Sequence, residues 1–145
     1  YGWISLNYHT CDVDSDMQSV AIARFNRYVK EVGFEEDTYI ISRRNGIDSF
    51  IISRLHNHKQ ENILELYKWV SENLPGSYGL LYIRDDEDFY GSYIDKYNYD
   101  DKTIDNSNNF VVWKLARGAL TMEKDTYLSP CIPKIEDGYS SDTKE

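Results

Sequence analysis

The chain has 145 residues, 41% of them hydrophobic and 14% aromatic, and its 25 acidic residues against 16 Lys and Arg give a formal net charge of −9. A chain of this length forms one ordinary domain, which buries roughly two-thirds of the surface that it exposes when unfolded. Its apolar runs are only a few residues long, far shorter than the roughly 20 residues that a transmembrane helix needs. The composition therefore predicts a single domain with a hydrophobic core and excludes a transmembrane protein.

The sequence carries no sign of secretion. It does not open with a basic segment followed by an apolar run, which is the pattern of a secretory signal. Its two Cys are too few for the disulfide scaffold of a small secreted protein. We therefore expect a cytoplasmic protein.

The negative charge is concentrated in one segment. Residues 85–105 hold eight acidic and two basic side chains, for a local charge of −6. Phosphate backbones are bound by Lys and Arg, so this segment repels DNA and RNA. We expect no nucleic-acid and no membrane partner, and a basic protein is the better match.

The first elements in chain order are a strand and a helix. Alternating apolar residues predict a strand over residues 1–9 that turns Ile4, Leu6 and Tyr8 toward the core. Residues 14–16 offer N-cap candidates, and Gly33 can end the helix that follows. The apolar stripe predicted for this helix is Met17, Ala21, Phe25, Tyr28 and Val32.

A hairpin and a second helix come next. Two β-branched runs, residues 38–44 and 47–55, flank Asn45-Gly46, which is typical of a two-residue hairpin turn. Helical spacing returns over residues 60–74, and Pro75-Gly76 ends it. The residues predicted to be buried in this helix are Ile63, Leu66, Tyr67, Val70 and Leu74.

The remaining strands complete the predicted fold. They lie at residues 78–84, 110–117 and around 120–122, with Gly118 in the last turn and Gly79 allowing close approach to the second helix. Trp3 and Trp113 are expected in the core or in cross-strand pairs. The class is α+β: one domain over residues 1–137, mainly an antiparallel sheet of five to six strands with two helices, in the order β-α-β-β-α-β-β-β. We expect an acidic Tyr-rich loop at about residues 85–109 and a disordered acidic tail at residues 138–145.

His56-Asn57-His58 is the best candidate for a metal site. Two His separated by one residue face the same way on an extended backbone and can share a metal. A third ligand is missing, because nothing in the sequence brings His9 or Cys11 near them. The favoured interpretation is that these residues cap the second helix or hydrogen-bond the loop that enters it. A metal-dependent hydrolase using His56 and His58 is a less favoured alternative. We expect no metal and no cofactor.

No catalytic motif is present. The acidic run of residues 85–88 lacks the alternating ligands and the Gly of a calcium loop, and adjacent exposed acids share one environment instead of two different ones. The sequence has no nucleophile-elbow, Walker or dinucleotide-binding pattern, and Cys11 and Cys131 are expected to be free. We therefore expect neither an enzyme nor a small-molecule substrate.

The segment after residue 88 interleaves aromatic and acidic side chains. Tyr offers a large contact area at low entropy cost, and carboxylates pair with Lys and Arg. Such a segment suits the basic cleft of an enzyme that cleaves nucleic acid. The alternative is a solvated loop whose rings pack on their own sheet.

Several blocks of the sequence carry a resemblance to a known family. They are Tyr1-Gly2-Trp3, the junction at residues 55–58, the run PGSYGLLYIRDDED at 75–88, FVVWKLARG at 110–118, Lys124-Asp125 and LSPCIP at 128–133. In this order, over residues 1–137, they resemble the immunity protein 7 family of bacterial polymorphic toxin systems. The resemblance implies a non-catalytic α+β domain, encoded beside a toxin and binding it in the cytoplasm. Toxins of such systems, including contact-dependent inhibition systems, are frequently nucleases.

The contact with the toxin is predicted in the acidic Tyr-rich segment, because residues 89–109 are longer and richer in Tyr than the family pattern. Specificity among related partners is expected outside the shared pattern. The predicted toxin-binding residues are Asp85, Asp86, Glu87, Asp88, Tyr90, Tyr93, Asp95, Tyr97, Tyr99, Asp100 and Asp101. The alternative function is an acidic protein-interaction module of another purpose.

Overall fold

A computed structural model gives the fold and describes residues 1–11, 14–54, 61–85 and 109–129. The element order is the predicted β-α-β-β-α-β-β-β, with a short 3-10 helix, η1, before the hairpin. The helices are α1 (Ser15–Val32), η1 (Glu36–Thr38) and α2 (Glu61–Asn73). The strands are β1 (Gly2–Leu6), β2 (Tyr39–Arg44), β3 (Ile47–Ile52), β4 (Tyr78–Ile83), β5 (Val111–Ala116) and β6 (Ala119–Lys124). The α+β class is confirmed.

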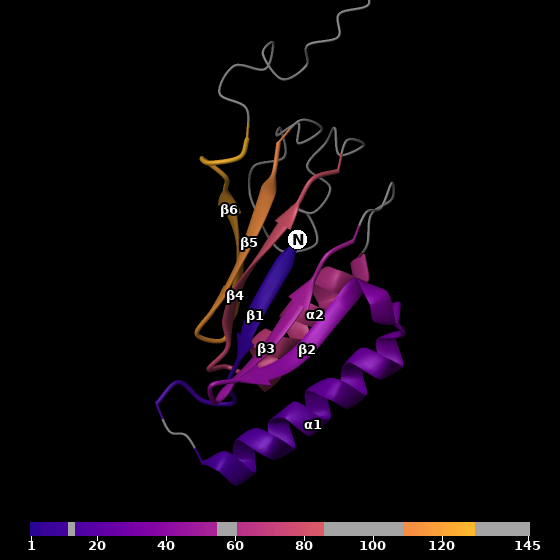
Figure 1. Cartoon of the computed structure of the whole chain (residues 1–145). Helices are drawn as coiled ribbons and strands as arrows, with labels where there is room; N and C mark the ends of the chain where they lie inside the picture. The colour runs from indigo at the N-terminus through magenta and orange to yellow at the C-terminus, as the bar shows by residue number, and fades with distance from the viewer. Residues whose placement is uncertain (12–13, 55–60, 86–108, 130–145) are drawn as a thin grey trace, which may run out of the picture. The chain divides into compact units, whose positions relative to one another are not determined.

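The strands form one antiparallel sheet in the order β2-β3-β1-β4-β5-β6 (Figure 1). The first strand lies inside the sheet, where Ile4 is opposite Phe50 of β3 on one side and Gly79 of β4 on the other. Contacts divide the chain into two units, residues 1–83 with 112–123 and residues 84–111 with 124–145. Both helices and nearly all of the sheet belong to the first unit.

The two hairpins use the turns that their sequences predict. Asn45 and Gly46 between β2 and β3 have φ of 53° and 76°, and Arg117 and Gly118 between β5 and β6 have φ of 51° and 74°. Two consecutive residues at positive φ match the right-handed twist of the flanking strands. The predicted Asn45-Gly46 hairpin is confirmed.

The ends of α1 are as predicted, but its buried face is not. The carboxylate of Asp14 accepts hydrogen bonds from the backbone N–H groups of Asp16 and Met17, and Gly33 ends the helix at φ 78°. Ala21 and Phe25 are buried as expected, whereas Met17 is 57% exposed. The helix instead buries Gln18, Ala21, Phe25 and Val29, and Tyr28 and Val32 are half-buried.

Gln18 explains this difference. Its Nε2 donates to the carbonyl oxygen of Leu6 at 2.8 Å and to Oδ2 of Asp48 at 3.0 Å, and its Oε1 accepts from the N–H of Tyr8 at 3.1 Å. A buried amide is tolerated when its donors and acceptor have partners. Apolar periodicity does not identify a buried polar residue. The predicted stripe therefore began at Met17, one residue before Gln18, where the buried face begins.

The buried stripe of α2 is confirmed at all five predicted positions. The hydroxyl group of Tyr67 reaches the sheet between two strands, where it lies 2.9 Å from the carbonyl oxygen of Leu80 in β4 and 3.3 Å from that of Trp3 in β1. A Cβ atom at Gly2 would collide with this hydroxyl group. A close approach to α2 was expected at Gly79, and the nearest neighbours of a Cβ atom there are instead the backbone atoms of Trp3 and Ile4 in β1.

Both helices pack on the same face of the sheet, α1 against β3 and α2 across β1 and β4 (Figure 1). The ring of Phe25 in α1 meets that of Phe50 in β3 edge to face at 5.5 Å. Tyr28 of α1 stacks on Trp69 of α2 at 4.6 Å with an interplanar angle of 8°. The core of the first unit therefore lies between the helices and one face of the sheet.

Candidate functional site

The opposite face of strands β1 to β4 carries neither α1 nor α2, and we call it the helix-free face. The strand register places ten residues on it: Trp3, Ser5, Ile40, Ser42, Arg44, Ile47, Ser49, Ile51, Tyr78 and Leu80. The exposed fractions are 62% for Ile40, 54% for Ile47, 49% for Ile51, 43% for Trp3 and 50% for Tyr78. In a sheet with one face toward solvent, the residues on that face are normally polar. The helix-free face is therefore unusually apolar.

The placement of Trp3 refines what the sequence predicted. Its ring meets Tyr78 of the neighbouring strand edge to face at 6.2 Å, so the expected cross-strand contact is confirmed. It is not a core residue, whereas Trp113 is fully buried as expected. The pattern that could have indicated this face is in the adjacent pairs Ile40-Ile41 and Ile51-Ile52, which put apolar side chains on both sides of β2 and β3.

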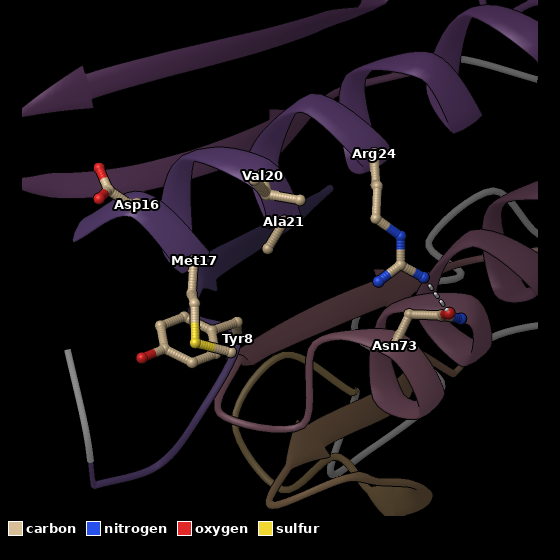
Figure 2. Close-up of a pocket in the computed structure, with 7 residues that line it drawn as sticks. All are labelled: Tyr8, Asp16, Met17, Val20, Ala21, Arg24 and Asn73. Atoms are coloured by element: carbon tan, nitrogen blue, oxygen red, sulfur yellow. Dashed lines mark hydrogen bonds between the residues drawn. The ribbon is translucent and has the colours of Figure 1, made fainter. Parts of the chain in front are cut away.

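A hollow of about 350 Å³ lies beside the first half of α1 (Figure 2). Its lining consists of Tyr8, Asp16, Met17, Val20, Ala21, Arg24 and Asn73. Nη2 of Arg24 donates to Oδ1 of Asn73 at 2.9 Å, and the guanidinium group lies over the ring of Trp69 at 6.0 Å. With one carboxylate and neither His nor Cys, this lining lacks the paired groups of acid–base or nucleophilic catalysis.

Of the predicted toxin-binding residues, Asp85 falls within the described part of the chain, and it is half-buried just after the end of β4. Beside it, the guanidinium group of Arg84 lies over the ring of Phe110 at 5.9 Å. The other predicted residues, from Asp86 to Asp101, lie outside the described residues. The acidic Tyr-rich contact therefore stays a prediction.

The metal-site candidates His56, His58, His9 and Cys11, and the second cysteine, Cys131, divide in the same way. His56, His58 and Cys131 lie outside the described residues. Cys11 is exposed, and its backbone N–H donates to Nδ1 of His9 at 3.1 Å. Within residues 1–11, 14–54, 61–85 and 109–129, no three His, Cys, Asp or Glu side chains gather in a way that could hold a metal ion. Neither α1 nor α2 is long and apolar enough to span a membrane.

Asp125 organises the turn after β6, in the second unit. Its carboxylate accepts hydrogen bonds from the backbone N–H groups of Tyr127, Leu128 and Ser129, and from the hydroxyl group of Ser129, at 2.6 to 3.1 Å. Burial alone would raise the pKa of Asp125, but these hydrogen bonds outweigh it and lower the pKa. Ser129 also accepts from the N–H of Phe110 at 3.1 Å. Asp125 of the shared Lys124-Asp125 block thus has a structural role that the sequence did not reveal.

No significant match was found among the curated proteins or among the solved structures. One family model, described as Immunity protein 7, matches residues 1–91 and 87–137. The two matched segments together contain all six strands, both helices and the Asp125 turn. The chain therefore belongs to the immunity protein 7 family.

Proposed function

We propose that this protein binds and neutralises a cognate secreted bacterial toxin by protein–protein contact, in the cytoplasm of the cell that produces the toxin. The observation that carries the proposal is membership of an immunity protein family over residues 1–137. Immunity proteins act by binding and are in general not enzymes. The protein would therefore act in stoichiometric amounts.

We propose further that the toxin is a nuclease of a polymorphic toxin system, such as a contact-dependent growth inhibition system. A nuclease holds its phosphate substrate with Lys and Arg, which also attract carboxylates. The local charge of −6 over residues 85–105 supports a partner of this kind. In this proposal Asp85 to Asp101 supply the carboxylates and Tyr rings that enter the basic cleft.

The test begins with the gene directly upstream, which should encode a large secreted protein with a toxic C-terminal domain. That domain is produced alone and together with this protein, and growth, complex formation and cleavage of DNA or RNA by the purified domain are measured. We expect growth to be rescued, a complex to form, and cleavage to stop at one equivalent of this protein. Unrescued growth together with no complex would refute the proposal.

The hydrolase alternative makes different predictions. An enzyme that uses His56 and His58 would contain zinc or manganese at unit stoichiometry in elemental analysis, and would turn over generic substrates. Replacing both residues with Gln would abolish its action. In our proposal the same double variant neutralises the toxin as well as the wild type does.

A further inference from the structure

The helix-free face contains an apolar row that crosses four strands in register. Ile40 of β2 is opposite Ile51 of β3, Ile51 is opposite Trp3 of β1, and Trp3 is opposite Leu80 of β4. Tyr78 extends the row through its edge-to-face contact with Trp3. Isolated exposed apolar residues need no explanation, but a contiguous exposed row indicates a contact site.

The helix-free face also has an unusual distribution of charge. Arg44 is its charged residue, and none of its positions in β1 to β4 is acidic, although the chain has 25 Asp and Glu. Arg44 is exposed and forms no salt bridge within the described ranges, whereas the adjacent Arg43 lies 3.7 Å from Asp48. The cores of protein interfaces are enriched in aromatic residues and Arg and depleted in Lys, Asp and Glu.

We infer that the helix-free face binds an apolar patch of the toxin domain, and that a carboxylate of the toxin pairs with Arg44. This inference rests on the proposed function and adds a second contact to the predicted acidic one. Trp3 and Tyr78 act as anchors, because their mutual contact restrains both rings before binding and lowers the entropy cost of the complex. Beside the apolar row, Ser42, Ser49 and Ser5 lie opposite one another in register, and the hydroxyl groups of Ser42 and Ser49 are 3.2 Å apart.

Charge complementarity favours the toxin over a second copy of this chain. In a two-fold dimer each copy contributes the same patch. Two helix-free faces would contribute two Arg44 side chains and no carboxylate from β1 to β4 to pair with them. A different protein can supply the missing negative charge.

Two variants with matched controls test the inference. Arg44→Glu should weaken binding of the purified toxin domain at least tenfold, whereas Arg27→Glu, at an exposed position of α1, makes the same change in net charge and should leave it unchanged. Ile40→Thr/Ile51→Thr should speed dissociation at least tenfold, whereas Met17→Thr/Val20→Thr removes similarly exposed apolar groups from α1 and should not. Circular dichroism shows whether each variant is folded. If the Ile40→Thr/Ile51→Thr variant does not fold, the result for Arg44→Glu alone tests the inference.

Hydroxyl-radical footprinting identifies what covers the face. We expect Trp3 and Tyr78 to react in the free protein and to be protected by the toxin domain. If the two rings are protected in the free protein and the protection increases with protein concentration, a second copy covers the face. If they are protected at every concentration, the protein's own chain covers it. Either result overturns the inference, as do variants that bind like their controls. Failure of the wild type to bind the toxin domain would instead refute the proposed function.

Discussion

The hydroxyl group of Tyr67 in α2 donates a hydrogen bond to the carbonyl oxygen of Leu80 in β4, at 2.9 Å. The side chain is fully buried, and this burial raises the pKa of the phenol, so the hydroxyl group remains a donor at physiological pH. The absence of a side chain at Gly2 leaves the space that the hydroxyl group occupies. One polar contact thus fixes α2 over the centre of the sheet, where the surrounding packing is apolar.

We expect Tyr67→Phe to lower the free energy of unfolding by about 1 to 2 kcal/mol, because a buried hydrogen bond is lost while the ring remains. Urea denaturation followed by circular dichroism measures the change. Tyr28→Phe is the control, since its stack on Trp69 does not depend on the hydroxyl group. Equal small losses in the two variants would show that the Tyr67 contact contributes little.

The two Trp residues of the sheet should respond differently to truncation. Trp113 is fully buried, so Trp113→Ala should cost about 3 to 5 kcal/mol. Trp3 is 43% exposed, and Trp3→Ala should cost about 1 kcal/mol or less if its main role is in binding. Thermal and urea unfolding measure both values. A midpoint that hardly changes in Trp113→Ala would contradict its place in the core.

The local signals in the sequence predicted the fold well where one residue type determines the geometry. Asp14 and Gly33 set the ends of α1, Asn45-Gly46 set the first hairpin, and the five apolar residues of α2 all face the core. These features depend on neighbours in the chain. They can therefore be recognised without knowing the tertiary structure.

Features that depend on distant partners could not be predicted in this way. Gln18 is buried because Leu6 and Asp48 satisfy its amide, and Gly79 is required by the backbone of β1. The apolar character of the helix-free face emerges only once the register aligns Ile40, Ile51 and Trp3. These contacts depend on the order of the strands in the sheet, which the periodicity of a single strand does not predict.

The hydrogen bonds to Asp125 predict a dependence of stability on pH. A carboxylate whose pKa is lowered by folding stabilises the folded state when it is ionised, and this contribution is lost as the pH falls through the folded pKa. We expect Asp125→Asn to cost about 1 to 2 kcal/mol at neutral pH, and less as the pH falls below about 4, the ordinary range of an Asp side chain. Urea unfolding at a series of pH values measures the difference.

Asp37→Asn, at an exposed position in η1, controls for the loss of one negative charge. Its cost should be small at every pH. If the difference between the wild type and Asp125→Asn stays constant from neutral to acidic pH, the hydrogen bonds of Asp125 do not depend on its charge.

The last prediction concerns the acidic Tyr-rich segment, for which Asp95, Asp100 and Asp101 are each replaced by Lys. If these carboxylates face Lys and Arg of a nuclease cleft, the triple variant should weaken toxin binding by about 2 kcal/mol or more, roughly thirtyfold. It should also flatten the dependence of the association rate on salt, because long-range attraction between opposite charges is screened by ions. Stopped-flow association at several salt concentrations measures both effects.

A matched control is available in the exposed acids Glu35, Glu36 and Asp37, whose replacement by Lys changes the net charge by the same amount. A general effect of charge would weaken the two triple variants equally, whereas a specific contact would weaken only the first. Tyr93→Ala and Tyr97→Ala separate the rings from the charges, since an anchoring ring acts mainly on the dissociation rate. If the first triple variant binds with unchanged affinity and salt dependence, the toxin does not contact this segment, and the charge of −6 over residues 85–105 needs another explanation.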